Sequence, residues 1–344
     1  MMLQALNRVS SYLGHDPLLT QGGGGNISLK DSQSNTIWVK ASGKWLKNAE
    51  KENIYIGLDL AKGKAWLESR TLEFPDSWYK GAHTSSSLPR PSIETAMHLL
   101  FDQKVVIHTH PISILSQSSQ PNSEEFFSQA LNGLAWAYIP YVKPGNELAF
   151  AIEAHPAYGK CNIYILKNHG LITCANNAEA CSALTKEVVA RCARPARSLF
   201  IASSQLSALK NSLSSNCLSP TLSQYHLADN TIINSLAIDP ISLDLFSPKN
   251  NVLYPDQAVF LGTNARIVQN LAEIKDAEKV PFVVVKNHGV LIYNDSPPML
   301  EEMLACHAQV LGRIPPNTKL DYLSENDVGE LINWDAEKYR KLMS

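Results

Sequence analysis

The sequence predicts an α/β protein, and three observations carry that prediction. Short apolar runs typical of buried strands alternate with amphipathic, helix-like segments along the chain. Turns rich in glycine and proline separate these segments. The chain has 344 residues, of which 44% are hydrophobic and 18% charged, so it is long enough for one large packed domain or two ordinary ones.

The bulk composition argues against several classes of function. The formal net charge is −2 and there is no basic run, so we expect no nucleic-acid partner. No stretch approaches the roughly 20 apolar residues that span a bilayer, and the first residues lack the apolar core of a signal peptide, so we expect no membrane partner. The six cysteines show no CxxC spacing, which indicates reduced thiols and a cytoplasmic protein.

The chain opens with a helix-like segment and a run of glycines. Leu3, Leu6, Val9 and Leu13 recur at helical spacing, which predicts an amphipathic helix to about residue 13. Four consecutive glycines at 22–25 are incompatible with regular structure, and their backbone N–H groups are free to approach a ligand.

A hairpin and a turn are expected after the glycines. Residues 26–29 alternate as a strand, and residues 35–40 have the pattern of its partner. Residues 41–44 form a turn of small residues. In that turn, the Ser42 hydroxyl and the Gly43 N–H group are both candidate anion contacts.

The next helix and strand carry the residues around which the prediction is organised. Ser92 suits the N-cap of a helix and Glu94 its first turn, and the helix is expected to end near Asp102. A strand-like apolar run then leads to His108 and His110. Because side chains alternate along a strand, these two histidines are expected to point the same way, about 7 Å apart.

A third histidine follows a second buried-strand pattern. Residues 163–166 are apolar, and the Lys-Asn-His-Gly run after them places His169 at the strand end. Three converging imidazoles are natural ligands of a divalent metal. Glu94 would then be a general base or a fourth ligand. His98 lies on the same helix face as Glu94, and we interpret it as a packed core histidine rather than a ligand.

Metal, base and anion contacts together suit one class of reaction. A hydroxy-carbonyl substrate would chelate the metal, a proton would move, and an enediolate would be stabilised electrostatically. Carbon–carbon cleavage, epimerisation and dehydration share that intermediate, so the residues leave these three reactions open.

A second Lys-Asn-His-Gly run predicts an internal duplication. Residues 286–289 follow an apolar strand pattern and precede a helical one, as residues 167–170 do. No His-x-His and no similar glycine run precede the second copy. It is therefore either a degenerate copy or a convergent strand end, and His288 is interpreted as a strand-end residue.

Composition predicts the domain boundaries. A long helix is expected over 177–193, and serines are frequent after it. We predict a first domain over residues 1–205, a serine-rich linker over 206–223, and a smaller C-terminal α/β region over 224–344. The last segment, 334–342, is expected to be helical.

The ordered set of motifs resembles the class II aldolase/adducin family, which includes fuculose-phosphate aldolase. The matching pieces are Gly24-Gly25-Asn26-Ile27-Ser28, Ala41-Ser42-Gly43, Pro91-Ser92-Ile93-Glu94, His108-Thr109-His110-Pro111, Pro140-Tyr141 to Gly145, and Asn168-His169-Gly170-Leu171. They occur in family order over roughly residues 3–194. The fuller runs are most similar to the aldolase portion of bifunctional aldolase/dehydrogenase proteins. No GxGxxG opens a βαβ unit here, so no dehydrogenase half is expected.

The resemblance implies a fold and a set of site residues. The fold would be a three-layer α/β/α domain with a mixed, mostly antiparallel sheet. His108, His110 and His169 would bind a divalent metal, zinc being the first candidate, and Glu94 would be the acid/base. The residues implied for the substrate phosphate site are Gly25, Asn26, Ser42, Gly43 and Ser92.

The resemblance also implies an activity, a metal-dependent lyase for a sugar or sugar-phosphate, and a homo-oligomer, a tetramer being favoured. Ile93 departs from the polar residue of sugar-phosphate aldolases, and Lys44 is the candidate to replace that contact. Tyr138 and Tyr141 are candidates for a catalytic tyrosine that some aldolases take from a neighbouring subunit. An epimerase, a dehydratase, or a non-enzymatic adducin-like module for oligomerisation or binding stays an alternative.

Overall fold

The computed structural model of the protein describes residues 2–71, 78–79, 89–197, 206–207, 209–211, 221–246, 252–274 and 280–344. Contacts divide the chain into two compact units. The first comprises residues 1–193 and 333–344, and the second comprises residues 194–332. Most of the predicted linker at 206–223 lies outside the described residues, so the boundaries expected there stay predictions.

The first unit is built on a seven-stranded sheet with the order β3-β2-β1-β4-β7-β6-β5. The strands are β1 (Asn26–Asp31), β2 (Thr36–Lys40), β3 (Tyr55–Asp59), β4 (Val105–Thr109), β5 (Trp136–Ile139), β6 (Ile163–Leu166) and β7 (Gly170–Ala175). All neighbouring strands are antiparallel except the β5–β6 pair, which is parallel. The sheet is therefore mixed and mostly antiparallel, which confirms the prediction.

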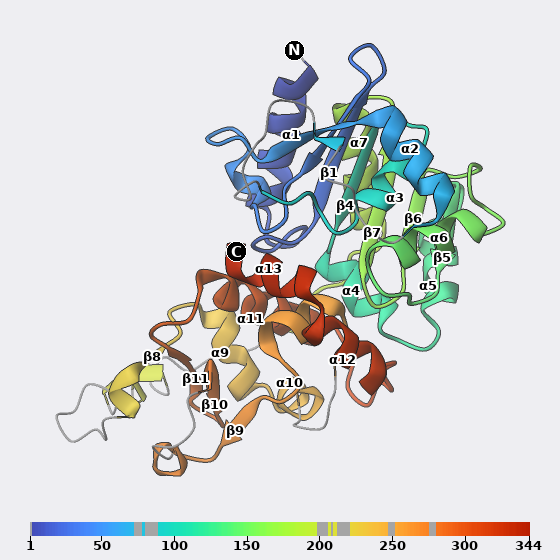
Figure 1. Ribbon diagram of the computed structural model, residues 1–344. Helices are drawn as coiled ribbons and strands as arrows, with labels where there is room; N and C mark the ends of the chain where they lie inside the picture. Colours follow the sequence, from blue (N-terminus) through green and yellow to red (C-terminus); the bar gives the residue numbers. More distant parts are fainter. Residues whose placement is uncertain are drawn as a thin grey trace. The chain divides into compact units, whose positions relative to one another are not determined.

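Helices cover both faces of this sheet and make three layers (Figure 1). One face carries α1 (Met2–His15), α4 (Ile112–Ser118), α5 (Ser123–Ala130) and α7 (Ala178–Arg191), and the other carries α2 (Leu60–Ser69), α3 (Thr95–Leu100) and α6 (Asn146–Ala154). A short 3-10 helix, η1 (Leu46–Asn48), packs on α1. Along β4, Val105 and Ile107 enter the core beneath α1 and α7, whereas Val106 enters the opposite core, as strand alternation requires.

Helix α3 begins later than the sequence pattern predicts. Its first residue is Thr95, so Glu94 is the capping residue before the helix rather than a first-turn residue. The hydroxyl of Ser92 accepts a hydrogen bond from the Glu94 N–H group at 3.3 Å. The short turn formed in this way holds Glu94 at the edge of the sheet, where its side chain meets β4.

The last helix of the chain belongs to the first unit. Helix α13 (Asp335–Met343) forms where a helical tail was predicted. The hydroxyl of Tyr339 accepts a hydrogen bond from the backbone N–H group of Arg90. The terminal ring carbon of Trp334 lies 3.0 Å from the position that a Cβ at Gly145 would occupy. Residues far apart in sequence therefore share one surface.

The second unit contains a four-stranded sheet with the order β8-β11-β10-β9. Its strands are β8 (Tyr225–Leu227), β9 (Arg266–Val268), β10 (Phe282–Val285) and β11 (Gly289–Tyr293). Its helices are η3 (Leu222–Gln224), α9 (Thr231–Ile238), α10 (Pro240–Leu245), the π-helix η4 (Gln257–Leu261), η5 (Leu271–Glu273), α11 (Pro298–Leu311) and α12 (Glu325–Asn333). The smaller C-terminal α/β region that was predicted is present.

This second sheet repeats half of the first. In both, a central antiparallel hairpin has an antiparallel strand on one side and a parallel strand on the other, so β8-β11-β10-β9 corresponds to β4-β7-β6-β5. Both hairpin turns place an asparagine at positive φ, 53° at Asn168 and 63° at Asn287. The shared topology supports a degenerate copy over a convergent strand end.

The registers also show where the two sheets differ in residue type. His108 pairs with Ile172, two residues after Gly170, whereas Leu227 pairs with Leu291, two residues after Gly289. Leu227 therefore occupies the place of His108, and Asp229 that of His110. Only His288 keeps the residue type of its counterpart, so the second sheet lacks the histidine triad.

Among the described residues, no helix combines the length and the apolar content needed to cross a bilayer.

Candidate metal centre

The three predicted histidines converge in the first unit. His108 lies on β4, His110 just after it, and His169 in the turn between β6 and β7. One ring nitrogen from each lies within 4.8 Å of the others, and all three side chains are buried. Because β4 and β7 are adjacent antiparallel strands, the end of β4 meets the start of β7, and the three imidazoles share one sheet edge.

A backbone contact fixes the orientation of His108. Its Nδ1 lies 3.0 Å from the carbonyl oxygen of Leu171, and because that oxygen can only accept, Nδ1 carries the proton. The lone pair of Nε2 therefore points into the cluster, where the Nε2 of His110 lies 3.0 Å away. A histidine held through its second nitrogen in this way is typical of metal ligands.

Glu94, the residue directly before α3, faces the same cluster. Its Oε2 lies 3.4 Å from the Nε2 of His108, and its Oε1 lies 3.5 Å from the Nε2 of His169. Oε1 is buried and accepts no hydrogen bond. A buried carboxylate oxygen without a hydrogen bond, aimed at ring nitrogens, is poised to accept a proton or to contact a cation.

The surroundings of Glu94 keep its carboxylate ionised. Burial acts to raise its pKa, but the positive charges of His108 and His169, which exist when those rings are protonated, and a hydrogen bond from Asn26 outweigh burial and lower the pKa to about 2. A bound cation would favour the carboxylate in the same direction. Glu94 is therefore a carboxylate at neutral pH, which is the state that a base requires.

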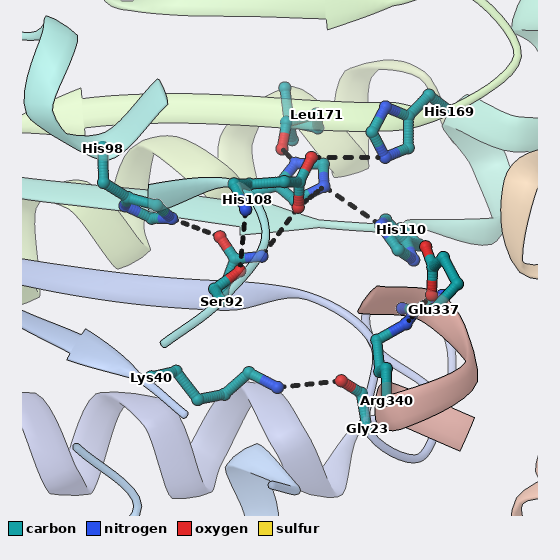
Figure 2. Close-up of polar contacts among 12 residues, drawn as sticks. Gly23, Lys40, Ser92, His98, His108, His110, His169, Leu171, Glu337 and Arg340 are labelled. Carbon is teal, nitrogen blue, oxygen red and sulfur yellow. Dashed lines mark hydrogen bonds and ion pairs between the residues drawn. The ribbon is translucent and has the colours of Figure 1, made fainter. Parts of the chain in front are cut away.

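Asn26, which is predicted to contact the substrate anion, lies beside Glu94. Its Nδ2 donates to the Oε2 of Glu94 at 2.8 Å, and its Oδ1 accepts from the Nε2 of His98. The Nδ1 of His98 in turn accepts from the Ser28 hydroxyl at 2.8 Å. Burial lowers the pKa of His98 to about 3, so its ring is neutral. His98 is thus a buried core histidine, and it orients the residue that holds Glu94 (Figure 2).

The structure divides the predicted anion-binding residues into two groups. Ser42 and Ser92 line a cavity of about 530 Å³. Gly25 instead packs against the backbone of His108, because a Cβ placed on it would lie 3.0 Å from the His108 carbonyl oxygen. Among the described residues that line the cavity, Asn26 and Gly43 do not appear.

Gly43 is covered by the C-terminal helix. Its φ is +77°, and a Cβ placed on it would lie 2.5 Å from the Cβ of Met343. The neighbouring Gly23 accepts a hydrogen bond from the Nζ of Lys40 at 2.8 Å, and its own Cβ position lies 2.9 Å from the Ser344 hydroxyl oxygen. The glycine-rich loop and the turn after β2 therefore meet at α13.

Two further predicted contacts have other partners. The Nζ of Lys44 lies 2.6 Å from a carboxylate oxygen of Glu52, so the proposed compensation for Ile93 by Lys44 has no support in the geometry. The hydroxyl of Tyr138 is hydrogen-bonded to Ser123, in the core on the α5 side of the sheet. These contacts lie within one chain, so a role for Tyr138 at the site of a neighbouring subunit stays a prediction.

Sequence reasoning missed the residues that complete the cavity wall. Arg90, Lys143, Trp334 and Tyr339 line it, together with Ser42 and Ser92. Glu337 and Arg340, also from α13, form a buried ion pair drawn in the same close-up as the histidines (Figure 2). The amphipathic pattern of 334–342 predicted a helix, but no local signal indicated where that helix packs.

The donor set fits a divalent cation. Three imidazoles converge, one of them held in the ligand tautomer, and a buried carboxylate oxygen without a hydrogen bond faces two of them. His108, His110 and His169 would hold the ion, and Glu94 could hold it or act as a base. This set is suited to proton transfer next to a polarised carbonyl.

Comparison with known proteins gives a family match over the part of the chain that carries these residues. Residues 5–194 match the family described as the class II aldolase and adducin N-terminal domain. The chain is 29% identical over 192 residues to a Bacillus subtilis (strain 168) protein named "Uncharacterized oxidoreductase YuxG", a match that covers 52% of this chain and 27% of that protein. The chain thus spans about a quarter of the length of this curated relative.

Solved structures of low sequence identity are similar to slightly more than half of the chain. The N-terminal class II aldolase domain of a Thermoplasma acidophilum protein is 22% identical, with a TM-score of 0.46, over 56% of this chain and 92% of that one. A sugar-phosphate aldolase from Thermotoga maritima is 12% identical, with a TM-score of 0.44, over 56% and 91%. An L-fuculose 1-phosphate aldolase is 18% identical, with a TM-score of 0.39, over 64% and 90%.

Proposed function

This chain belongs to the class II aldolase/adducin family through residues 5–194, and from that premise we propose that it is a metal-dependent lyase of the aldolase type. The substrate would be a hydroxy-carbonyl sugar or sugar-phosphate, cleaved or formed at a carbon–carbon bond through an enediolate. One observation carries the proposal: the ionised, buried Glu94 faces two of three converging histidines within 3.5 Å.

The chain's own residues have distinct roles in this proposal. His108, His110 and His169 hold the metal, and the Leu171 carbonyl keeps His108 in the tautomer that binding needs. Glu94 accepts a substrate proton at Oε1 and returns it in the reverse direction, while Asn26 holds Oε2 in place.

The metal would supply positive charge. A divalent cation held by the three histidines would supply Lewis-acid polarisation of a substrate carbonyl. Zinc is our first candidate, because imidazole nitrogens are among its usual protein ligands.

Alternative reactions on the same site share this machinery. An epimerase or dehydratase would use the same base and the same enediolate. A non-enzymatic module of the adducin kind is disfavoured by the retained histidines and by the ionised Glu94, since neither is needed for partner binding. We also propose that the protein forms a homo-oligomer, a tetramer being favoured, as its family resemblance implies.

The test is a Glu94→Gln variant assayed against a panel of ketoses and ketose phosphates. Losing the base should lower kcat by about 10²- to 10⁴-fold while the metal content is unchanged. Glu125→Gln is the matched control, since Glu125 is an exposed carboxylate on α5 that does not line the cavity, and this variant should keep most of its kcat. Aldehyde release identifies a lyase, and an isomeric or dehydrated product identifies an alternative. Undiminished turnover in Glu94→Gln would refute the proposed mechanism.

A further inference from the structure

We propose that helix α13 is a lid over the histidine cluster, which opens to admit a metal ion or a substrate and closes to exclude water. The helix follows the whole second unit in the sequence but belongs to the first unit. This inference rests on the metal centre of the proposed function and not on its lyase chemistry. It also explains the glycine run at 22–25, which contributes no ligand to the metal centre.

The histidine cluster is closed to a substrate as the structure stands. His108, His110 and His169 are 0%, 6% and 4% exposed, and Glu94 is 5% exposed. In the proposed function a substrate has to contact both the metal and Glu94, and the covering side chains leave no direct approach from solvent to either. A covering segment therefore has to move, which is how lids and loops admit substrates to many enzymes.

The C-terminal segment forms one wall of the cavity that leads towards Glu94. Ser92 and Thr95, on either side of Glu94 in the sequence, line this cavity, and so do Trp334 and Tyr339. Neither Glu94 nor any of the three histidines is among the described residues that line it. The cavity therefore ends short of the metal centre while α13 is in its closed position.

Two glycines form the surface on which the end of α13 lies. A Cβ placed on Gly43 would lie 2.5 Å from the Cβ of Met343, and one placed on Gly23 would lie 2.9 Å from the Ser344 hydroxyl oxygen. Glycine has no side chain, so the helix end can approach the backbone of both loops this closely. The loop that carries Gly23 continues into β1, which pairs with the ligand strand β4. The glycine run therefore joins the lid to the metal centre.

The attachment of α13 is weak. All nine residues of this helix are described, and the buried ones are Glu337 and Arg340, an ion pair that Figure 2 draws with the histidines. The apolar Leu342 and Met343 are 84% and 48% exposed. A helix normally docks through a buried apolar face, whereas burying an ion pair carries a desolvation penalty that offsets its Coulomb attraction. The helix can therefore open while the first unit stays folded.

A hinge and a latch can be assigned to particular residues. Helix α12 ends at Asn333 and α13 begins at Asp335, and Trp334 between them is extended, with φ −71° and ψ 124°. A single non-helical residue between two helices suits a hinge. The guanidinium carbon of Arg90 lies 4.5 Å from the centre of the Tyr339 ring, and the Tyr339 hydroxyl accepts a hydrogen bond from the Arg90 N–H group. This contact holds the lid closed.

The experiment measures how often the cluster is uncovered, by labelling the full-length, metal-free protein with diethyl pyrocarbonate. This reagent acylates accessible neutral imidazoles, so neither metal nor substrate is needed. Peptide mass spectrometry reads the rate at His110. His226 in the second unit is the internal standard, because its side chain is 46% exposed. His98 reports unfolding of the first unit, because it is completely buried in the core.

Two variants loosen the lid from different sides. Tyr339→Ala removes the contact with Arg90. Gly23→Val places a side chain against the end of α13, and Gly23 has no positive φ, so valine there meets no backbone strain. Leu342→Ala is the matched control, because Leu342 belongs to the same helix and its side chain is exposed.

We expect the labelling rate of His110 relative to His226 to rise about tenfold or more in Tyr339→Ala and in Gly23→Val. The rate should be unchanged in Leu342→Ala, and His98 should stay unlabelled. The parent rate at His110 in both loosened variants would overturn the inference, and so would equal gains at His98 and His110, which report unfolding. A protein that binds no metal but shows the expected labelling would remove the proposed function and leave the lid standing.

A second measurement tests passage of the metal. Zinc-loaded protein is mixed with the colorimetric chelator 4-(2-pyridylazo)resorcinol, and the rate of zinc release is followed. Tyr339→Ala should release zinc about tenfold faster than the parent, and Leu342→Ala at the parent rate. Equal rates in all three proteins would overturn the role of α13 in metal exchange.

Discussion

The side-chain amide of Asn26 holds Glu94 in place: its Nδ2 donates to the carboxylate Oε2 at 2.8 Å. The opposite end of the amide is fixed by His98, whose ring is itself hydrogen-bonded to Ser28. Every donor in this chain points towards Glu94. The buried polar network therefore orients the carboxylate and stabilises its charge before any substrate arrives.

Removing the amide should change the pH dependence of activity. In Asn26→Leu, Glu94 loses a hydrogen bond that lowers its pKa, so its pKa should rise, by about one unit or more for a bond to a charged group. The acidic limb of the kcat/KM profile should move to higher pH. Ser28→Ala, at the far end of the chain, should move it less. An acidic limb unchanged in Asn26→Leu would contradict the assigned role.

The free energy of unfolding should depend on the protonation of His98 between about pH 6.5 and pH 3. Burial lowers its folded pKa to about 3, against an ordinary value of 6.5, so the unfolded chain binds the extra proton between these values. The contribution of His98 to the free energy of unfolding is therefore complete above pH 6.5. It decreases as the pH falls towards 3, by up to about 1.4 kcal/mol per pH unit.

Urea unfolding of the metal-free protein between pH 7 and pH 5 measures this slope. His98→Gln should flatten it for the first unit. His307 is a matched case in the second unit, because burial also lowers its pKa to about 3, and His307→Gln should flatten the slope there. Identical slopes in the parent and in both variants would show that neither ring is buried in its neutral form.

A glycine next to the metal ligands should tolerate no side chain. A Cβ placed on Gly170 would lie 2.5 Å from the Thr109 carbonyl oxygen and 3.1 Å from the Cδ2 of His110. Gly170→Ala should separate β4 from β7, reduce metal content and lower the unfolding free energy by about 1–3 kcal/mol. Gly329→Ala, in a helix where the Cβ meets nothing within 4 Å, should instead be neutral or stabilising by about 1 kcal/mol. Equal metal content in both variants would contradict the packing argument.

The sequence was sufficient for the local part of the site. His108 and His110 are two residues apart at the end of one strand, so strand alternation predicts that they point the same way. Their convergence with His169 depends on the pairing of β4 with β7. The resemblance of the motifs to a family likewise predicted the three-layer fold and its mixed, mostly antiparallel sheet. The position of Asn26 depends on strand pairing, which the sequence does not reveal. Asn26 lies opposite His108 in the β1–β4 register, and this pairing places it next to Glu94.

The cavity wall could not be predicted in this way. Tyr339 meets Arg90 across 249 residues of sequence, and a helical pattern indicates only that a segment is amphipathic, not which surface it covers. Lys44 looked like the nearest cation in the sequence, but its partner is Glu52. The exact start of α3 depends on the turn at Ser92, which moves the N-cap by two residues, from Ser92 to Glu94.

The central claim is that His108, His110 and His169 hold a metal, and elemental analysis of the purified protein tests it most directly. The account predicts about one divalent ion per chain, zinc first, and a loss of at least ten-fold in His108→Ala. His288→Ala is the matched control, since the second sheet carries Leu227 and Asp229 where the first carries histidines, and it should keep the full metal content. A metal-free protein after incubation with zinc, manganese, cobalt or iron, or full metal content in His108→Ala, would contradict the account.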